Sequence, residues 1–427
     1  MGRPLLGCIA DDFTGATDLA NNLVRAGMRA VQTIGIPEGP LVADADAVIV
    51  ALKSRTTAPA EAVAQSLAAL RWLQAQGVEQ VYFKYCSTFD STPAGNIGPV
   101  TDALLDALHG AGQGFTIACP AFPENKRTVF KGYLFAGDVL LNESGMQNHP
   151  LTPMRDPNLV RVLQLQTKRK VGLVAYDTVA QGPDAVRERF AALQADGVGI
   201  AVLDAICNAD LMRIGPALAD MPLVTAGSGI AIGLPQNWLA TTQLAAGQRA
   251  DTLPPFEGLG AVVSGSCSVA TNAQVTHFKQ AGHPSFAVEP LDVAAGVDVV
   301  GAALRWAAPL LAQGPVLVYA TAEPESVQAV QARLGVAKAG ELVEHALSSI
   351  ARGLVEQGVR QLVVAGGETS GAVVQALGIR QMTIGPQIDP GVPWTWAHTE
   401  LGIPIHLALK SGNFGTADFF VKTFQRR

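Results

Sequence analysis

The sequence predicts an α/β protein of two domains, each a mainly parallel sheet flanked by helices, with the active site in the cleft between them. Short β-branched runs alternate with Ala- and Leu-rich amphipathic stretches along almost the whole chain, which is typical of βαβ units. At 427 residues the chain is too long for one core of ordinary size. Residues 247–260, which include Pro254 and Pro255, carry no periodicity and interrupt the alternation.

We therefore expect a first domain over residues 1–248, a linker over 249–260 and a second domain over 261–427. The apolar runs predict the following strands: Leu5–Ala10, Ala47–Leu52, Gln80–Lys84, Phe115–Cys119, Val171–Ala175, Ile200–Asp204, Ala261–Ser264, Val316–Ala320, Gln361–Ala365 and Ile405–Leu409. Helices are expected from about Gly15 to Arg25 and from Val100 to Leu108.

The composition excludes several classes of protein. Hydrophobic residues make up 48% of the chain and charged residues 15%, which is typical of a well-buried enzyme. Lys and Arg number 30 against 36 Asp and Glu, giving a net charge of −6, which argues against a nucleic-acid partner. No apolar run approaches ~20 residues, and no signal-peptide pattern is present, so we expect a soluble, cytoplasmic protein without a membrane partner.

The metal-binding residue types show no ligand spacing. The five cysteines form no C-x-x-C pair, and the seven histidines show no H-E-x-x-H motif. Reduced thiols are therefore expected, and a tightly held transition metal is not. The sequence leaves the existence of a homo-oligomer open.

Two adjacent carboxylates, Asp11 and Asp12, follow the first predicted strand. Ligands of open α/β sheets bind beyond the carboxyl ends of strands, so this pair is a candidate site. A dinucleotide fingerprint would require glycines here, and anions would repel a pyrophosphate. We expect Asp11 and Asp12 to face a substrate hydroxyl. The alternative is that Asp12 or Thr14 only caps the following helix.

Three further strand ends in the first half carry polar groups, after Leu52, after Phe83 and at Asp204. Arg55 could bind a carboxylate through two N–H groups, and Lys84 supplies a point charge. Asp90, Ser91 and Asn96 could bind the hydroxyls of a polyol chain. For Arg55 alone, the alternative is a solvated surface arginine. The convergence of several parallel strand ends favours a shared acid-binding site.

Strand ends in the second half are rich in glycine instead. Three such segments each lead into a probable helix: Ser264–Ser268, Gly366–Gly371 and Lys410–Gly415. Glycine lets backbone N–H groups approach an anion, and helix N-termini favour negative charge, so three loops on one sheet edge suit a polyphosphate. A single loop of this kind could be only a tight connection. The chain contains no Walker A sequence.

Within these loops Lys410 is a candidate phosphate partner and Glu368 a candidate for orienting Mg²⁺. Another glycine-rich segment, Gly227-Ser228-Gly229 with Gly233, has the wrong spacing for a dinucleotide site. We interpret this segment as a hinge or a wall of the cleft.

Five ordered motifs resemble the four-carbon acid sugar kinase family: Ala10–Ala16, Lys84–Asn96, Ser264–Ser268, Gly366–Gly371 and Lys410–Gly415. The resemblance covers essentially the whole chain. It implies a sugar-acid-binding N-terminal domain and a nucleotide-binding C-terminal domain. Threonate and erythronate kinases of this family typically carry Lys-x-Asp-Ser-Thr-Leu-Arg-Gly-Asn, whereas Lys84–Asn96 is longer. The longer form looks like the branch that phosphorylates the terminal hydroxyl of 3-oxo-tetronates.

The resemblance therefore implies an ATP- and Mg²⁺-dependent kinase acting on the 4-hydroxyl of a four-carbon 3-oxo sugar acid. Asp12 is the first candidate for the base and Asp11 the second, and either could instead hold magnesium. Candidate substrate-binding residues are Thr14, Arg55, Lys84, Asp90, Ser91 and Asn96. Candidate nucleotide-binding residues are Ser264, Gly265, Ser266, Gly366, Gly367, Glu368, Thr369, Ser370, Gly371, Lys410, Gly412 and Asn413.

Several alternatives remain open at the level of the sequence. The acceptor could be D-threonate or D-erythronate, and its stereochemical series is not determined. A different class, an NAD(P)-dependent sugar-acid dehydrogenase, is weakened by the missing Gly-x-Gly-x-x-Gly turn. A third alternative is a sugar-acid binding protein without catalytic activity, but this function would not explain the three glycine-rich loops of the second half.

Overall fold

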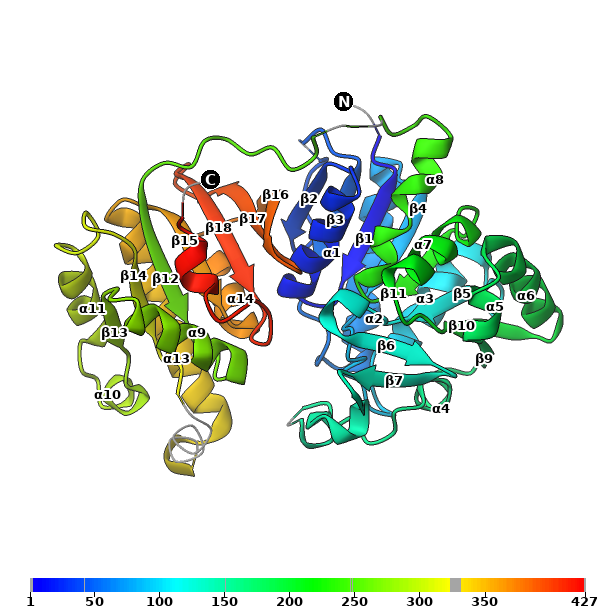
Figure 1. Ribbon diagram of the computed structural model, residues 1–427, viewed down its shortest axis with the longest axis horizontal. Coiled ribbons are helices and arrows are strands. Elements are labelled where there is room, and N and C mark those ends of the chain that lie inside the picture. Colours follow the sequence, from blue (N-terminus) through cyan, green and yellow to red (C-terminus); the bar gives the residue numbers. More distant parts are fainter. Residues whose placement is uncertain are drawn as a thin grey trace. The chain divides into compact units, whose positions relative to one another are not determined.

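The chain divides into two compact units, Met1–Asp251 and Thr252–Arg427, and both are α/β structures (Figure 1). The computed structural model describes residues 3–41, 43–149, 151–245, 247, 249–322 and 332–425. Of the domain limits predicted from the sequence, the first residue, Gln248 and the last residue lie outside the described residues. The first strand of the second unit begins at Leu259, inside the predicted linker.

The sheet of the first unit is parallel, in the order β2-β3-β1-β4-β11-β5-β10-β9. Its register places Ala10 at the end of β1 level with Ala51 on β3 and Lys84 on β4. The loops that follow these strands therefore leave the sheet at one edge. The strands are β1 (Leu6–Ala10), β2 (Ala30–Ile34), β3 (Ala47–Ala51), β4 (Gln80–Lys84), β5 (Thr116–Cys119), β9 (Lys170–Val174), β10 (Val198–Leu203) and β11 (Leu223–Ala226).

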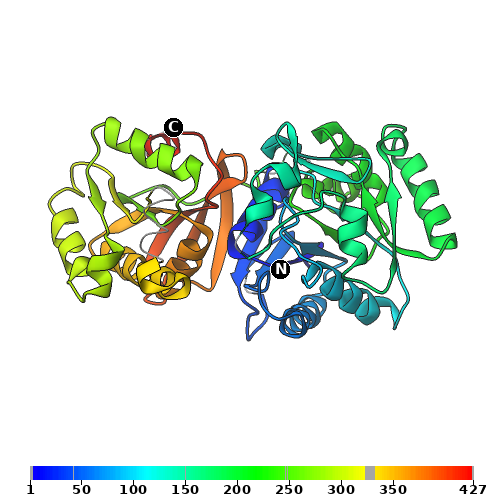
Figure 2. The ribbon, with the colours of Figure 1, turned by 90° about the horizontal axis from the view of Figure 1, so that it is seen from below.

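Helices cover both faces of this sheet, with α1 on one face and α2 and α3 on the other (Figure 2). The helices are α1 (Phe13–Arg25), α2 (Pro59–Gln76), α3 (Ile97–His109), α4 (Leu159–Gln164), α5 (Tyr176–Val179), α6 (Pro183–Ala195), α7 (Asn208–Ala217) and α8 (Pro235–Ala240). Short 3₁₀ helices are η1 (Pro123–Asn125), η2 (Leu141–Glu143), η3 (Met146–Asn148) and η4 (Gly229–Ile232). α2 begins at Pro59 and is capped at its C-terminus by Gly77, which has a φ of 80°. Proline at the first position and glycine at the C-cap are common at the ends of helices.

A small antiparallel sheet of β6 (Arg127–Phe130), β7 (Tyr133–Ala136) and β8 (Val139–Leu140) is attached to this unit. Asp204, directly after β10, fastens it by accepting backbone N–H bonds from Lys131 at 2.6 Å and Gly132 at 2.8 Å. Burial raises the pKa of this carboxyl, and the backbone bonds oppose that rise. Asp204 therefore has a structural role.

The sheet of the second unit has the order β13-β14-β12-β15-β18-β17-β16. Its first five strands are parallel to one another. The next strand, β17, runs antiparallel to both of its neighbours, β18 and β16. Adjacent strands β12, β15 and β18 carry the three glycine-rich loops at their carboxyl ends (Figure 1). The strands are β12 (Leu259–Ser264), β13 (Ser285–Ala287), β14 (Val316–Tyr319), β15 (Val359–Ala365), β16 (Gln381–Asp389), β17 (Val392–His398) and β18 (Pro404–Lys410).

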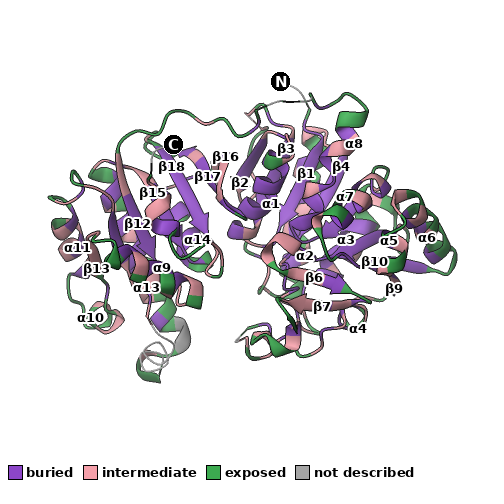
Figure 3. Cartoon of the chain, viewed as in Figure 1, coloured by how far each residue is buried: buried purple, intermediate pink, exposed green. Residues whose placement is uncertain are grey.

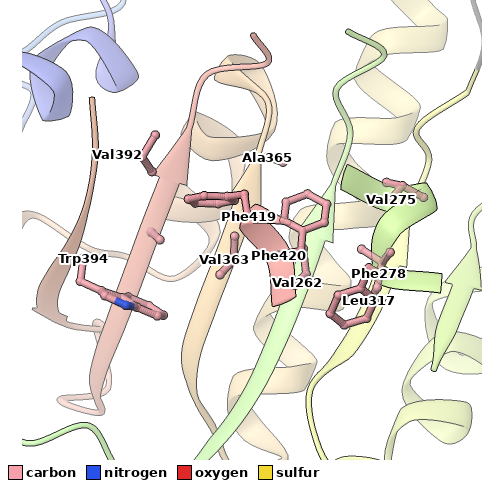
Figure 4. Packing of buried hydrophobic residues seen from close by; sticks show 11 residues of the cluster. Val262, Val275, Phe278, Leu317, Val363, Ala365, Val392, Trp394, Phe419 and Phe420 are labelled. Carbon is pink, nitrogen blue, oxygen red and sulfur yellow. The ribbon is translucent and has the colours of Figure 1, made fainter. Parts of the chain in front are cut away.

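The helices of this unit are α9 (Val269–Gln280), α10 (Pro290–Ala294), α11 (Val299–Ala307), α13 (Val336–Glu356), α14 (Gly367–Ala376) and α15 (Phe419–Lys422). α9 and α13 lie on opposite faces of the sheet (Figure 2). Phe278 of α9 packs with Phe419 and Phe420 of α15 over Val262 and Val363 of the central strands (Figure 4). Burying this apolar face stabilises the strands whose ends carry the loops.

Every predicted strand exists within one to two residues of its expected limits. In Figure 3 these strands are largely buried, whereas outer helices such as α6 show exposed residues. The prediction missed β2, β11, β13, the small sheet of β6, β7 and β8, and the antiparallel hairpin of β16 and β17. None of the described helices is both long and apolar enough to cross a membrane.

Candidate active site

The junction of β1 and α1 places Asp11 and Asp12 at the carboxyl edge of the first sheet. Asp12 caps α1, because its Oδ1 accepts the Gly15 N–H at 3.2 Å, while its Oδ2 accepts the Thr14 hydroxyl at 2.9 Å. The predicted cap is therefore present. The Asp12 side chain is 24% exposed and that of Asp11 is 8% exposed. Capping thus leaves Asp12 accessible to a ligand.

Arg55, in the loop after β3, binds both carboxylates. Its Nε and one terminal nitrogen each donate to Asp11 at 2.8 Å, and that terminal nitrogen also donates to Asp12 Oδ1 at 2.5 Å. The other terminal nitrogen lies 3.7 Å from Asp90 Oδ2. The guanidinium that was expected to bind a substrate carboxylate is thus already paired with Asp11 in a two-point contact.

The two carboxyls respond oppositely to this environment. Burial raises the pKa of Asp11, and the contact with Arg55 opposes that rise without cancelling it. Burial also raises the pKa of Asp12, but the charges of Arg55 and Lys84 outweigh it, so the net pKa is lowered. Asp12 is therefore the carboxylate held in the ionised form, which can accept a proton or a hydrogen bond.

Lys84, the last residue of β4, is almost fully buried at 2% exposure. Its Nζ donates to the carbonyl of Tyr85 at 2.8 Å. A Cβ atom at Gly15 would lie 2.8 Å from that Nζ and closer still to Asp12 Oδ1. Gly15 thus leaves the space in which the ammonium and the Asp12 carboxylate sit.

The loop after β4 contains strained backbone. Phe89 and Asp90 have positive φ values of 61° and 20°, which non-glycine residues adopt rarely and often at functional sites. Asp90 accepts the Thr88 hydroxyl at 2.6 Å. Ser91 is buried, and its hydroxyl accepts the Gln166 amide at 2.7 Å.

Asn96 anchors the Arg55 loop. Its side-chain amide donates to the carbonyls of Ser54 at 2.7 Å, Arg55 at 3.1 Å and Thr57 at 3.0 Å. Its Oδ1 is buried and has no hydrogen-bond partner among the described residues. The side chain that was expected to bind a substrate hydroxyl thus uses its donor to hold the backbone around Arg55.

The glycine loops of the second unit meet at the ends of β12, β15 and β18. The N–H groups of Gly265 and Ser266 donate to Ala365 O at 3.0 and 3.2 Å, and the N–H of Gly366 donates to Lys410 O at 2.8 Å. Gly366 has a φ of 122° and precedes α14 without a side-chain cap. The first N–H groups of α14 therefore lack partners inside the helix and can bind an anion.

The hydroxyl groups around these loops are mostly buried. Ser264 and Thr321 share a hydrogen bond of 2.7 Å. Ser370, in α14, has a fully buried hydroxyl with no partner among the described residues, whereas Thr369 is 4% exposed and Glu368 is exposed. A Cβ atom at Gly412 would lie 2.5 Å from the Ser266 hydroxyl. The loops thus approach each other so closely that Gly412 cannot carry a side chain without displacing its neighbour.

Lys410 is directed into the protein. Its Nζ donates to Thr271 Oγ1 at 2.9 Å, Ser411 O at 3.1 Å and Gly412 O at 3.0 Å. Gly412 O also accepts the Thr271 hydroxyl at 2.9 Å and that of Ser268, which caps α9. Burial lowers the pKa of Lys410 to about 7. Lys410 thus joins the Gly412 loop to the start of α9.

Comparison with known proteins identifies the chain's family. Residues 6–234 match the sugar-binding N-terminal domain, and residues 261–420 match the nucleotide-binding C-terminal domain. A 3-oxo-tetronate kinase of Burkholderia multivorans is 63% identical over 99% of this chain and 97% of its own. One of Pseudomonas fluorescens is 61% identical over 98% and 96%. The chain belongs to the four-carbon acid sugar kinase family.

Two solved structures have the same fold as this chain. A crystal structure from Salmonella typhimurium LT2 is 44% identical with a TM-score of 0.87, and one from Haemophilus influenzae is 45% identical with a TM-score of 0.78. Each covers 98% of both chains. The Salmonella protein is described provisionally as a tRNA synthase, a description that the 3-oxo-tetronate kinases do not share. As a four-carbon acid sugar kinase, the chain is a phosphotransferase that uses ATP.

Two buried polar residues near the carboxyl edge of this kinase's first sheet were not among the predicted site residues. Asp18 and Ser228 are both buried, and the Ser228 hydroxyl donates to Asp18 Oδ2. A signal was present in the sequence of α1, because polar residues recur at helical spacing on its buried side, Thr17, Asp18 and Asn21 among them. Buried polar residues in a helix usually serve a network or a site.

The described part of the chain shows no cluster of magnesium ligands. Among the described residues, no group of three or more His, Cys, Asp or Glu side chains is arranged to hold a metal ion. In kinases the nucleotide phosphates supply much of the coordination of Mg²⁺.

Proposed function

We propose that this kinase transfers the γ-phosphoryl group of ATP to the terminal 4-hydroxyl of a four-carbon 3-oxo sugar acid, a 3-oxo-tetronate. The observation that carries the proposal is the 61–63% identity, over nearly the full length, to proteins named 3-oxo-tetronate kinase. The charged site of the first unit and the glycine loops of the second unit support it, because one suits an acid substrate and the other a polyphosphate.

We assign the acid substrate to the first unit. Lys84 and the terminal nitrogen of Arg55 that faces Asp90 are the cationic groups available to its carboxylate. Asp90, Ser91 and Thr14 would orient its hydroxyl groups. Asn96 contributes by holding the Arg55 loop, and its unpartnered Oδ1 is suited to accept a hydroxyl hydrogen.

We assign the base to Asp12. Phosphoryl transfer needs alignment and charge neutralisation more than covalent chemistry, and the acceptor hydroxyl must lose a proton as the new P–O bond forms. Asp12 is ionised and partly exposed. Both oxygens of Asp11 are paired with Arg55, which suits a residue that positions Arg55.

We assign ATP to the loops after β12, β15 and β18. The residues present fit a polyphosphate, since Gly366 and Gly412 let the backbone approach and α14 begins directly after Gly366 without a side-chain cap. Ser264, Gly265, Ser266, Gly367, Thr369, Ser370, Gly371 and Asn413 complete these loops. Magnesium bound to the phosphates would neutralise the charge that develops during transfer, with Glu368 as a candidate to orient it.

The proposal is tested by incubating the purified protein with ATP, Mg²⁺ and a panel of tetronic and 3-oxo-tetronic acids. We expect ADP to form with a 3-oxo-tetronate and the phosphate to be attached at C4, as read by ³¹P NMR. ADP formation with D-threonate or D-erythronate alone would move the protein to another branch of the family. Consumption of NAD(P)⁺ without ADP formation would overturn the proposal.

A further inference from the structure

Asp18 and Ser228 form a buried contact that the proposed reaction does not use. Asp18 lies in the second turn of α1, and Ser228 lies in the loop after β11. The Ser228 hydroxyl donates to Asp18 Oδ2, and Asn22, four residues along the helix, donates its amide to Ser228 O at 2.9 Å. One face of α1 therefore binds Ser228 through both its side chain and its backbone.

The loop that carries Ser228 packs closely against the backbone that follows β5. A Cβ atom at Gly227 would lie 2.8 Å from the carbonyl of Pro120, and one at Gly229 would be closer still to the carbonyl of Ala121. The Tyr82 hydroxyl donates to Gly227 O. The glycines that looked like a hinge in the sequence thus pack the loop directly onto the backbone after β5, and Ser228 is held against Asp18.

The second oxygen of the Asp18 carboxyl, Oδ1, accepts no hydrogen bond from the residues that the structure describes. Asp18 is 4% exposed, and its Oδ1 is buried without a hydrogen bond among the described residues. A carboxylate in such a place is costly unless a nearby positive charge compensates it. The charged groups that act on it are Lys84 from β4 and Arg127 from β6, which favour its ionised form, and Asp12, which opposes it. Tyr82 from β4 also faces it.

Lys84 is the cation that links Asp18 to the site. Its ammonium lies against the first turn of α1, in the space that Gly15 leaves open beside Asp12. Asp18 is one turn further along the same helix face, three residues after Gly15. The ammonium therefore lies within the electrostatic reach of two carboxyls, one that takes part in the proposed chemistry and one that does not.

We propose that Asp18, held by Ser228, is a positioning residue that sets the net charge around the Lys84 ammonium and thereby the affinity of this unit for the carboxylate of its acid substrate. The proposal rests on the proposed function, because it takes Lys84 as part of the acid-binding site. An ionised Asp18 compensates Lys84 and competes with the substrate carboxylate for its charge. A protonated Asp18 leaves that charge to the substrate.

The direction of the effect follows from the state of Asp18. Burial raises the pKa of Asp18 to about 7, against the lowering effect of Lys84 and of the Ser228 hydrogen bond. Asp18 is thus protonated below neutral pH and ionised above it. Affinity for the acid substrate therefore falls as the pH rises through neutrality.

The test is calorimetric titration of the full chain with a 3-oxo-tetronate, without nucleotide, from about pH 6 to about pH 8. We expect the Kd of the wild type to rise about threefold to tenfold over this range. Asp18→Asn should keep the low-pH Kd throughout, because asparagine resembles the protonated acid. Ser228→Ala should move the midpoint upward by about one pH unit, because the lost hydrogen bond favoured the ionised form.

Asp102→Asn is the matched control. Asp102 is another carboxyl of the first unit whose pKa burial raises, and it pairs with Thr167 and Arg169 instead of Lys84. This variant should show the pH dependence of the wild type. The same pH dependence in Asp18→Asn as in the wild type, or an unmoved midpoint in Ser228→Ala, would overturn the role of Asp18 while leaving the proposed function intact. Failure of the wild type to bind any 3-oxo-tetronate would overturn both.

Discussion

The loops at the strand ends of the two units present different groups to their proposed ligands. In the first unit, Arg55 is paired with Asp11 and Asp12, and Lys84 is buried beside them. In the second unit, backbone N–H groups and hydroxyls surround Gly366 and Gly412. Under the proposed assignment, a small acid would be recognised by a few charges whose balance matters, whereas a polyphosphate would be recognised by the path of the backbone. Substitutions that change charge should act on the first ligand, and substitutions that add a side chain should act on the second.

Of the variants that test this difference between the two units, Asp12→Asn should show the largest effect. We expect kcat to fall by about 100- to 10,000-fold, because an amide cannot accept the hydroxyl proton. The affinity for ATP should stay near that of the wild type, because Asp12 belongs to the first unit. Steady-state kinetics and calorimetry with ATP measure the two effects. A variant that retains more than about a tenth of the wild-type rate would move the role of base to Asp11.

Gly366→Ala tests the backbone site. Its φ of 122° is one that a residue with a Cβ atom adopts only at a cost, about 1 to 3 kcal/mol. We expect the affinity for ATP to fall at least about tenfold, with the affinity for the acid unchanged. Gly282→Ala is the matched control, because Gly282 also has a positive φ, of 82°, but a Cβ atom there would meet nothing within 4 Å. Equal losses of ATP affinity in the two variants would contradict the assignment.

Arg55→Ala should raise the KM for the acid roughly 10- to 100-fold, since a lost charge-assisted contact costs about 1.5 to 3 kcal/mol. The KM for ATP should hardly change. Arg55→Lys distinguishes charge from geometry, because lysine cannot reproduce the two-point contact with Asp11. Equal effects on both substrates would assign Arg55 a structural role instead.

Lys410→Met should have the smallest effect. The pKa of Lys410 is lowered to about 7 by burial, so its positive charge is present below neutral pH and is lost as the pH rises above it. We expect the affinity of the wild type for ATP to decline about two- to fivefold more than that of the variant between about pH 6 and about pH 8.5. Taking the ratio of the two proteins cancels the titration of ATP itself. Parallel pH profiles would show that the charge does not reach the nucleotide.

The sequence predicted the features that depend on local patterns. The strand that leads into Asp11 and the loop that leads from Gly366 into α14 follow from alternation, caps and glycine placement. The contacts between side chains could not be predicted from these local patterns. Arg55 and Asp11, for example, are 44 residues apart and meet only through the pairing of β1 with β3. The inward direction of Lys410 depends likewise on where α9 begins, which its own neighbours in the sequence do not indicate.

The antiparallel hairpin of β16 and β17 was missed for a related reason. A strand's direction is set by the strand it pairs with, and the apolar run of β17 is compatible with either direction. The contact between Asp18 and Ser228 was missed because the two residues are 210 positions apart in the sequence. Long-range pairing is therefore the information that the local patterns lack.

The three bonds from the Asn96 amide have a consequence for engineering the acceptor range. Asn96 closes the segment that begins at Lys84, and the same side chain holds the carbonyls of Ser54, Arg55 and Thr57. The family resemblance implies that the length of this segment differs between branches, yet both of its ends take part in fixed contacts. Residues 85–95, which include the buried side chains of Tyr85 and Phe89, are the cassette whose exchange would test what sets the acceptor range. A chimaera that takes this cassette from another branch should keep Lys84 and Asn96. The Asn96 amide then continues to hold the backbone around Arg55 while the loop changes.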